Sequence, residues 1–205
     1  LRNKPNQLYA AIDHETEGLN LFFTRPFQIA MILAEGDKIK ERFEYYIYWP
    51  DLKMSEDAAR ITRFDKSLYV AKAKPPKEVW ESVGKFLYNK DYLLVTQNWL
   101  NYDCFIWSAL ERGIGLTPNF SYLDRVIDMG YLAKAIKLGL APPTENRLAW
   151  FYKLADFRQK GLKSGLTACC KEYGIELDPQ KQHDSLYDVE KTFECFTKQK
   201  WMIEI

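Results

Sequence analysis

The chain has 205 residues, and we expect residues 1–205 to form a single domain because a second full-sized domain would be cramped. Its 47% hydrophobic and 28% charged residues are typical of a globular protein, and its 10 glycines and 9 prolines exclude a fibrous or low-complexity chain. The 29 Lys and Arg residues nearly balance the 28 Asp and Glu residues. This balance argues against a protein that coats long duplexes but not against an enzyme that acts at a nucleic-acid end.

The cysteines and the apolar runs indicate the compartment. No C-x-x-C pair occurs, so neither a disulfide framework nor a zinc ribbon is expected. A reducing, cytoplasmic setting fits best. The first residues contain no apolar signal-peptide core, and the longest aliphatic run, residues 29–34, is too short to cross a membrane. We therefore expect no membrane association.

Three strands are predicted in the first quarter of the chain, at residues 7–13, 26–34 and 39–49. Residues 35–38 form a turn between the second and the third, and the third alternates apolar and polar side chains. Short connections of this kind favour an antiparallel meander.

Helices and further strands follow. Ser55 is a good N-cap for a helix that extends to about residue 64, and apolar residues recur at helical spacing over 78–88. Residues 92–96 are continuously apolar, which is typical of a central strand buried on both faces. A helix over 102–112, a strand within 122–128, a helix over 130–138 and three helical pieces between 144 and 200 complete the chain. The order predicts an α/β protein with a mixed sheet.

The first candidate site follows the first strand. Strand side chains alternate, so Asp13 and Glu15 point to one face and His14 to the other. Two carboxylates at a sheet edge make a hard-oxygen site suited to Mg²⁺ or Mn²⁺. The alternative is a pair of solvated acids, and a D-x-E pattern alone is weak.

The second candidate is Asp103, which lies five residues after Asn98, between the predicted central strand and the next helix. Ligand and catalytic sites of α/β proteins gather at the carboxyl ends of such strands. A helix N-cap is the alternative role for this aspartate.

The third candidate pairs His183 with Asp188, at the start of the last helix. A spacing of five does not align two side chains on one helix face, so the histidine is expected in the loop before the helix. Asp184 is then the capping residue. Asp128, which precedes another helix, is expected to be a cap and not a catalytic residue.

Taken together, these patterns resemble the DEDDh-type 3′–5′ exonucleases, the family of the bacterial proofreading subunit, ribonuclease T and oligoribonuclease. The resemblance also covers residues 27–32 and 165–175, and it extends over about the whole chain. It implies an RNase H-like fold with a mixed five-stranded sheet, an antiparallel meander followed by parallel strands, flanked by helices. The residues that match the family's four acids and histidine are Asp13, Glu15, Asp103, Asp188 and His183.

The resemblance also implies a mechanism. Asp13, Glu15 and Asp188 would hold one ion beside the attacking water, and Asp13 with Asp103 would support a second ion near the leaving group. His183 would act as general base. The implied substrate contacts are Thr16, Gly18, the apolar wedge Leu19, Asn98 and the stacking surface Trp99.

Three features depart from the family pattern. Glu17 stands where the family commonly has Thr, which would add an acid near the metals, and residues 142–161 have no family counterpart. The second motif, with Asn98 five residues before Asp103, is closer to the proofreading domains of family B polymerases, but those carry a tyrosine in the third motif, so His183 decides the subtype. A buried core position is an equal alternative for Trp99.

The expected function is therefore release of mononucleotides from a single-stranded or frayed 3′ end. A catalytically silent module that binds nucleic-acid ends is the alternative, and a metal phosphoesterase of unrelated fold is disfavoured. DNA or RNA preference, a polymerase partner and the oligomeric state stay open.

Overall fold

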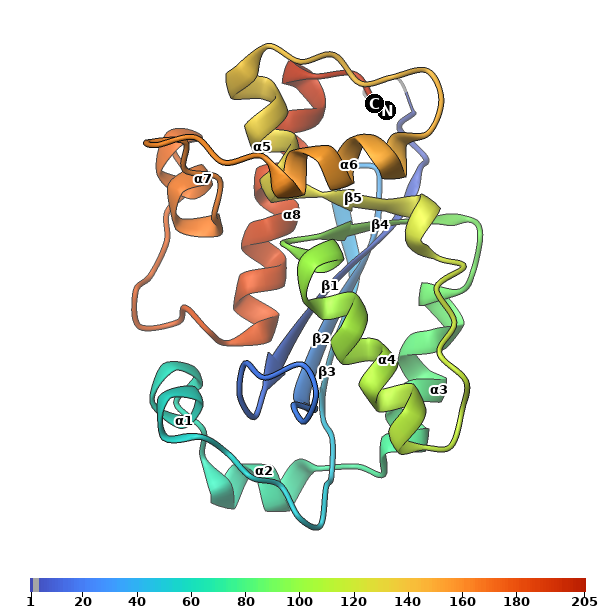
Figure 1. The fold of residues 1–205 in the computed structure, drawn as a ribbon, viewed down its shortest axis with the longest axis vertical. Helices are drawn as coiled ribbons and strands as arrows, with labels where there is room; N and C mark the ends of the chain where they lie inside the picture. The colour runs from blue at the N-terminus through green and yellow to red at the C-terminus, as the bar shows by residue number, and fades with distance from the viewer. Residues whose placement is uncertain (2–3) are drawn as a thin grey trace.

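A computed structural model describes residue 1 and residues 4–205, and a five-stranded sheet lies at its centre (Figure 1). The strand order is β3-β2-β1-β4-β5. β1 pairs antiparallel with β2 and parallel with β4, while β2–β3 is antiparallel and β4–β5 is parallel. This is the predicted mixed sheet. The strands are β1 (Leu8–Thr16), β2 (Pro26–Glu35), β3 (Lys38–Tyr46), β4 (Tyr92–Thr96) and β5 (Val126–Asp128).

Helices cover both faces of the sheet. α8 lies on one face together with α5 and α7, and α3 and α4 lie on the other (Figure 1). None of the helices in the described residues combines the length and apolar composition needed to cross a bilayer. The helices are α1 (Glu56–Thr62), α2 (Lys66–Lys72), α3 (Pro76–Leu87), α4 (Asp103–Gly113), α5 (Met129–Leu138), α6 (Arg147–Asp156), α7 (Leu166–Glu172) and α8 (Ser185–Met202).

The central strand β1 packs against both helical layers. Tyr9 contacts Phe193 and Phe196 of α8, with ring centroids 5.9 and 5.2 Å apart. His14, on the opposite face by alternation, lies 6.3 Å from the ring of Trp107 on α4. Odd-numbered residues of β1 therefore face α8 and even-numbered residues face α4.

Several predicted elements have different bounds in the structure. β3 ends at Tyr46 and not at residue 49, because beyond it the chain pairs with Lys74: Ile47 forms a bridge with Lys74, and the Tyr48 N–H donates to the Lys74 carbonyl at 2.8 Å. β5 is only three residues long, since a 3₁₀ helix over Leu123–Arg125 takes up the first half of the predicted strand.

One helix, α2, was not predicted. Asp65 caps it by accepting the N–H groups of Ser67 and Leu68 at 2.8 and 3.0 Å. Tyr69 is its one buried residue, so the sequence carries no apolar stripe at helical spacing to reveal it.

The unassigned segment 142–161 forms α6 and closes one side of the core. Phe151 and Leu154 are buried in it. Lys134 of α5, itself only 8% exposed, donates from Nζ to the Leu154 and Phe157 carbonyls at 2.7 and 3.2 Å. This lysine satisfies carbonyl groups that the end of α6 leaves unpaired. The segment thus packs into the main hydrophobic core.

Truncation of Phe151 should test this structural role. Its side chain is fully buried, so Phe151→Ala should lower the free energy of unfolding by about 3–5 kcal/mol through lost burial and a cavity. The neighbouring Tyr152 is 40% exposed, and Tyr152→Ala should cost clearly less. Urea unfolding followed by circular dichroism measures both. Equal losses would show that α6 is only loosely attached.

Candidate active site

Asp13 and Glu15 lie near the end of β1, on the face that packs against α8. Both are half-buried, and β1 is hydrogen-bonded on both edges as far as Ala11. Beyond Ala11 the pairing with β4 stops, while the pairing with β2 continues past both acids. The two carboxylates therefore sit where the sheet opens on one side, on a strand that cannot shift.

Asp188 and His183 reach the same place from the start of α8. Asp184 is the N-cap, accepting the Tyr187 N–H at 3.0 Å, as predicted. His183 lies in the preceding loop with φ of 65°, and its own N–H donates to Asp188 Oδ2 at 3.0 Å. One possible ligand atom each of Glu15, His183 and Asp188 all lie within 4.8 Å of one another. The structure thus brings together three side chains that are up to 173 residues apart in the sequence.

Asp103 approaches the cluster from the other helical layer. It is the first residue of α4 and is 6% exposed. Its Oδ1 lies 3.1 Å from Nδ1 of His14, whose ring stacks on Trp99 at 4.9 Å. Asp103 is not the N-cap, since Tyr102 occupies that position. The carboxylate is instead oriented by a buried histidine, a contact that the sequence did not predict.

The structure corrects the assignment of Trp99 as a stacking surface. Trp99 is fully buried under His14, so no face of its ring is open to a base. The core alternative holds for this residue. Asn98 is exposed beyond β4, and its side-chain oxygen accepts the Tyr131 hydroxyl at 3.1 Å.

The loop after β1 begins with a compact hydrogen-bonded turn. The Gly18 carbonyl accepts the Thr16 hydroxyl at 2.8 Å and the Tyr102 hydroxyl at 2.7 Å. Tyr102 precedes Asp103, so this turn ties the loop directly to the second acidic motif. Leu19, just beyond the turn, is 84% exposed.

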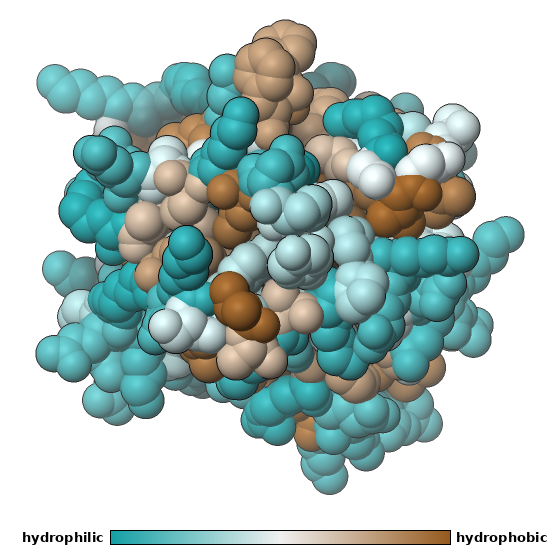
Figure 2. All heavy atoms as spheres, turned by 90° about the horizontal axis from the view of Figure 1, so that it is seen from below, coloured by the Kyte–Doolittle hydropathy of each residue, from teal (hydrophilic) through white to brown (hydrophobic). Residues whose placement is uncertain are grey.

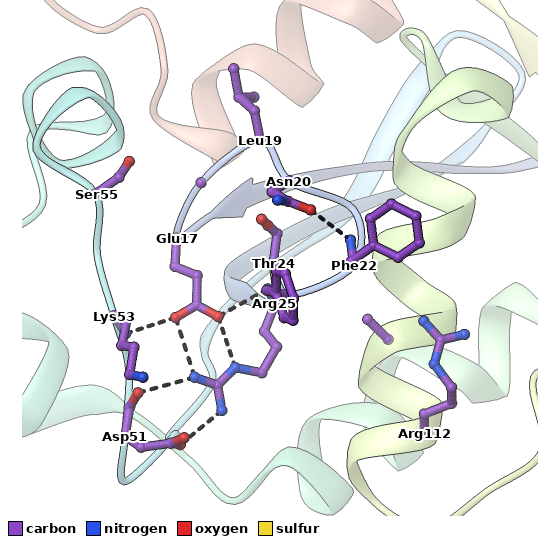
Figure 3. A pocket seen from close by; sticks show the side chains of 13 residues that line it. Glu17, Leu19, Asn20, Phe22, Thr24, Arg25, Asp51, Lys53, Ser55 and Arg112 are labelled. Carbon is purple, nitrogen blue, oxygen red and sulfur yellow. Dashed lines mark hydrogen bonds and ion pairs between the residues drawn. The ribbon is translucent and has the colours of Figure 1, made fainter.

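Glu17 does not join the acidic cluster, contrary to the sequence expectation. It is 5% exposed, and its carboxylate accepts the Arg25 Nε–H at 2.8 Å and the Lys53 main-chain N–H at 2.8 Å. Arg25 also pairs with Asp51 at 2.8 Å. Figure 3 shows Glu17 pointing toward this arginine and away from Leu19. Its charge is neutralised locally, and its role is to fix the loop.

Burial and mutual repulsion disfavour the charged forms of the clustered acids. Burial is the main cause for Asp13, whose pKa is well above the ordinary value, with added repulsion from Glu15 and other carboxylates. Burial and then the charge of Asp188 raise the pKa of Glu15 to about 9. Burial raises the pKa of Asp188 to about 6, although the His183 N–H opposes the shift. Burial also raises the pKa of Asp103, against the hydrogen bond from His14.

The residues present fit a divalent cation. Asp188 Oδ1 is buried without a hydrogen-bond partner among the described residues, and Asp188 shares a cluster with a second carboxylate and an imidazole. Carboxylate oxygens are the ligands that Mg²⁺ and Mn²⁺ prefer, and a cation among them would reverse the pKa shifts.

Comparison with known structures identifies the fold. Exonuclease I of E. coli in complex with a dT13 oligonucleotide superposes with a TM-score of 0.73 at 18% identity, over 95% of this chain and 41% of that chain. The zinc-bound complex of the same protein with single-stranded DNA gives 0.72 at 19% identity, over 96% and 41%. The chain has the fold of exonuclease I. The predicted resemblance to DEDDh exonucleases is thereby confirmed at the level of fold.

Sequence comparison gives distant relatives. DNA polymerase III of the PolC type from Staphylococcus epidermidis is 23% identical over 197 residues, and the Staphylococcus aureus protein is 24% identical over 190 residues. These matches cover 96% and 93% of this chain but only 12% and 11% of the polymerases. The chain also spans about two fifths of exonuclease I. No protein-family model matches the sequence.

Sequence reasoning missed two residues of the site. His14 could have been found, because alternation places it opposite Asp13 and Glu15 in the same motif, where a buried polar ring requires a partner. Tyr102 carried no such signal, since its contact with Gly18 joins segments 84 residues apart.

The acidic cluster should make the cation-free protein less stable as pH rises. The folded-state pKa values of Asp188, about 6, and Glu15, about 9, exceed the unfolded values of about 4, so the folded chain retains protons that the unfolded chain releases. The stabilisation is complete below about pH 4 and is lost through about 6 and then 9. Saturating Mg²⁺ should restore about 2.7 kcal/mol at 100 times its Kd. Thermal unfolding in EDTA and in Mg²⁺ measures both effects.

Asp188→Asn provides the matching variant. It should remove the contribution of Asp188 to the pH dependence between about 4 and 6, leaving that of Glu15, and remove most of the Mg²⁺-induced shift. Asp91→Asn, an exposed acid between α3 and β4, should behave like the wild type. A Mg²⁺ shift that survives in Asp188→Asn would place the cation elsewhere.

Proposed function

We propose that the chain is a metal-dependent 3′–5′ exonuclease that releases mononucleotides through a two-ion mechanism with His183 as general base. One observation carries the proposal: Glu15, Asp188 and His183 converge within 4.8 Å at the open end of β1. Asp13 and Asp103 lie close enough to repel one another's charges there. The exonuclease I fold supports the same conclusion, because it was solved with a DNA strand bound.

In this proposal Asp13, Glu15 and Asp188 hold Mg²⁺ or Mn²⁺, and Asp103 assists through water. Two divalent ions would neutralise the scissile phosphate and stabilise the leaving 3′ oxygen. The chain's own contribution is to fix the ligands. The His183 N–H holds Asp188 Oδ2, and His14 holds Asp103 Oδ1, so each carboxylate keeps a second oxygen for other partners.

His183 accepts the proton of the attacking water in this proposal. Its side chain is exposed, so a solvent molecule can reach it, while its main chain is fastened to Asp188. This hydrogen bond keeps His183, the proposed base, at a fixed position relative to Asp188, the proposed metal ligand. A nitrogen of the His183 imidazole also lies within 4.8 Å of the carboxylate oxygens of Glu15 and Asp188. The imidazole is therefore placed to act either as a base or as a metal ligand.

The loop after β1 would give the enzyme its preference for the 3′ end of a strand. Thr16 and Gly18 present a closed turn beside the acids, and Leu19 projects beyond it as an apolar wedge for the last two bases. Asn98, at the neighbouring edge, is a further proposed contact to the substrate. The buried free thiols of all four cysteines support a reducing, cytoplasmic setting.

Hydrolysis of an oligonucleotide should require a divalent metal, the clustered acids and a free 3′ end. Asp13→Ala should abolish turnover of a 5′-labelled oligonucleotide in Mg²⁺ without unfolding the chain, because it removes a carboxylate from a repelling cluster. EDTA should do the same. A 3′-phosphate should slow cleavage far more than a 5′ block.

Gel analysis of products on DNA and RNA distinguishes the outcomes. Cleavage of a closed circle would indicate an endonuclease. Tight binding of oligonucleotide ends without any turnover in Mg²⁺ or Mn²⁺ would support the catalytically silent binding module.

Loss of His183 should slow the chemical step. His183→Ala should reduce kcat by about 10²–10⁴-fold, the usual contribution of a positioned general base. The wild-type rate should rise with pH to a plateau, and the variant should lose or shift this limb. Metal affinity, measured by calorimetry, should change little. A large drop in metal affinity would identify the imidazole as a ligand, and an unchanged rate would make it structural.

A further inference from the structure

The loop between β1 and β2 displays apolar side chains to solvent. Phe22 is 91% exposed and Phe23 is 79% exposed, next to the proposed wedge Leu19 at 84%. Figure 2 faces this end of the molecule, and apolar atoms emerge there among hydrophilic ones. Phenylalanine is normally buried, so two adjacent exposed rings indicate a surface that meets a partner.

The exposure of these rings is fixed by the loop's own hydrogen bonds. Asn20 accepts the Phe22 N–H on its side chain at 3.0 Å and the Phe23 N–H on its carbonyl at 3.0 Å. The Glu17 carboxylate closes the base of the loop on Arg25. The Asn20 hydrogen bonds and the Glu17–Arg25 contact therefore hold the backbone in a conformation that exposes both rings.

The two rings line a cavity of about 610 Å³ that opens beside α4. Ala109 and Arg112 of α4 form the far wall, and Lys53 and Ser55 lie on a third side. In Figure 3 the Phe22 ring lies on the side of the loop that faces α4 and Arg112.

Three cationic side chains and two carboxylates line this cavity, which leaves a net charge of +1. The carboxylates, Glu17 and Asp51, share the one guanidinium of Arg25. Arg112 and Lys53 are exposed, and neither forms an ion pair with a carboxylate among the described residues. An occupant therefore needs flat apolar groups for the rings and anionic groups for the cations.

An unpaired nucleic-acid strand has both chemical features. Every base offers a face for stacking, and every nucleotide carries one phosphate. In a duplex the faces are already stacked on neighbouring base pairs, so a duplex cannot use both rings without unwinding.

We infer that Phe22 and Phe23 form a stacking platform for an unpaired strand, with Arg112 and Lys53 binding its phosphates. This inference rests on the proposed nuclease function and specifies its substrate as a single strand. The cavity starts at Glu17, two residues beyond Glu15, and the Tyr102 hydroxyl joins the same turn to the Asp103 motif. A strand on the platform would thus lie beside the acidic cluster.

Binding without turnover tests the platform. Fluorescence anisotropy in EDTA measures the Kd of a labelled single-stranded oligonucleotide of twelve thymidines, about 12 nucleotides being within the usual range for one site. The double variant Phe22→Ala, Phe23→Ala should bind about 10- to 100-fold more weakly, the loss expected for one or two stacked bases. Phe22→Trp should retain affinity, while Phe22→Leu, which keeps the apolar bulk, should lose most of the contribution of that ring.

The matched control is Trp201→Ala. Trp201 is 58% exposed near Lys38 and Lys40 and lies in α8, outside the cavity, so its loss should leave Kd unchanged. A blunt duplex should bind weakly and respond little to any of these variants. Unchanged single-strand affinity in the double Ala variant, or equal affinity in Phe22→Leu and Phe22→Trp, would overturn the stacking platform.

A second substrate separates this inference from the proposed function. The p-nitrophenyl ester of thymidine 5′-phosphate has one base and no upstream strand, so its hydrolysis in Mg²⁺ by the wild type reports on the acids alone. If neither the ester nor the oligonucleotide is hydrolysed, the nuclease proposal fails. The Kd values of the variants, measured by anisotropy, still show whether Phe22 and Phe23 bind a single strand.

Discussion

Four carboxylates meet at one end of β1, and their mutual repulsion is the constraint on which the surrounding structure depends. Burial raises the pKa of each one, so the folded chain holds them together at a cost in stability. β1 cannot relieve the repulsion by shifting, because β2 pairs with it past both acids. Hydrogen bonds from His183 to Asp188 and from His14 to Asp103 partly offset the repulsion. Asp103 occupies the first position of α4 and Asp188 the first turn of α8, so both acids lie at the positive ends of helix dipoles.

The alternation of β1 explains how two helical layers reach one site. Tyr9, Asp13 and Glu15 face α8, where the aromatic contacts of Tyr9 set the distance between strand and helix. His14 faces α4 and hydrogen-bonds the first residue of that helix. A shift of one residue in the register of β1 would turn both acids toward α4 and His14 toward α8. The buried pairing of β1 with β2 and β4 is therefore as important for the site as the acids themselves.

Local patterns in the sequence were sufficient for much of this arrangement. The apolar run of β4, the Asp184 cap and the loop position of His183 each follow from the chemistry of a few neighbouring residues, and the structure has all three. The bounds of β3 and the burial of Trp99 depend on tertiary contacts, with Lys74 in one case and His14 in the other. Such contacts leave no periodic signal, and they account for the elements that sequence analysis assigned incorrectly.

Glu15 and Glu17 show why a list of acids does not define a site. They are two residues apart, yet only Glu15 lies in the cluster. A change of register between Glu15 and Thr16 interrupts the alternation, and Glu17 then meets Arg25 across the loop. An acid that would have increased the repulsion becomes the anchor of a rigid loop. Glu17 holds Arg25 at the base of the loop, and Asn20 holds the backbone at Phe22 and Phe23. The loop therefore presents two exposed phenylalanine rings, whose exposure contributes little burial to an isolated chain.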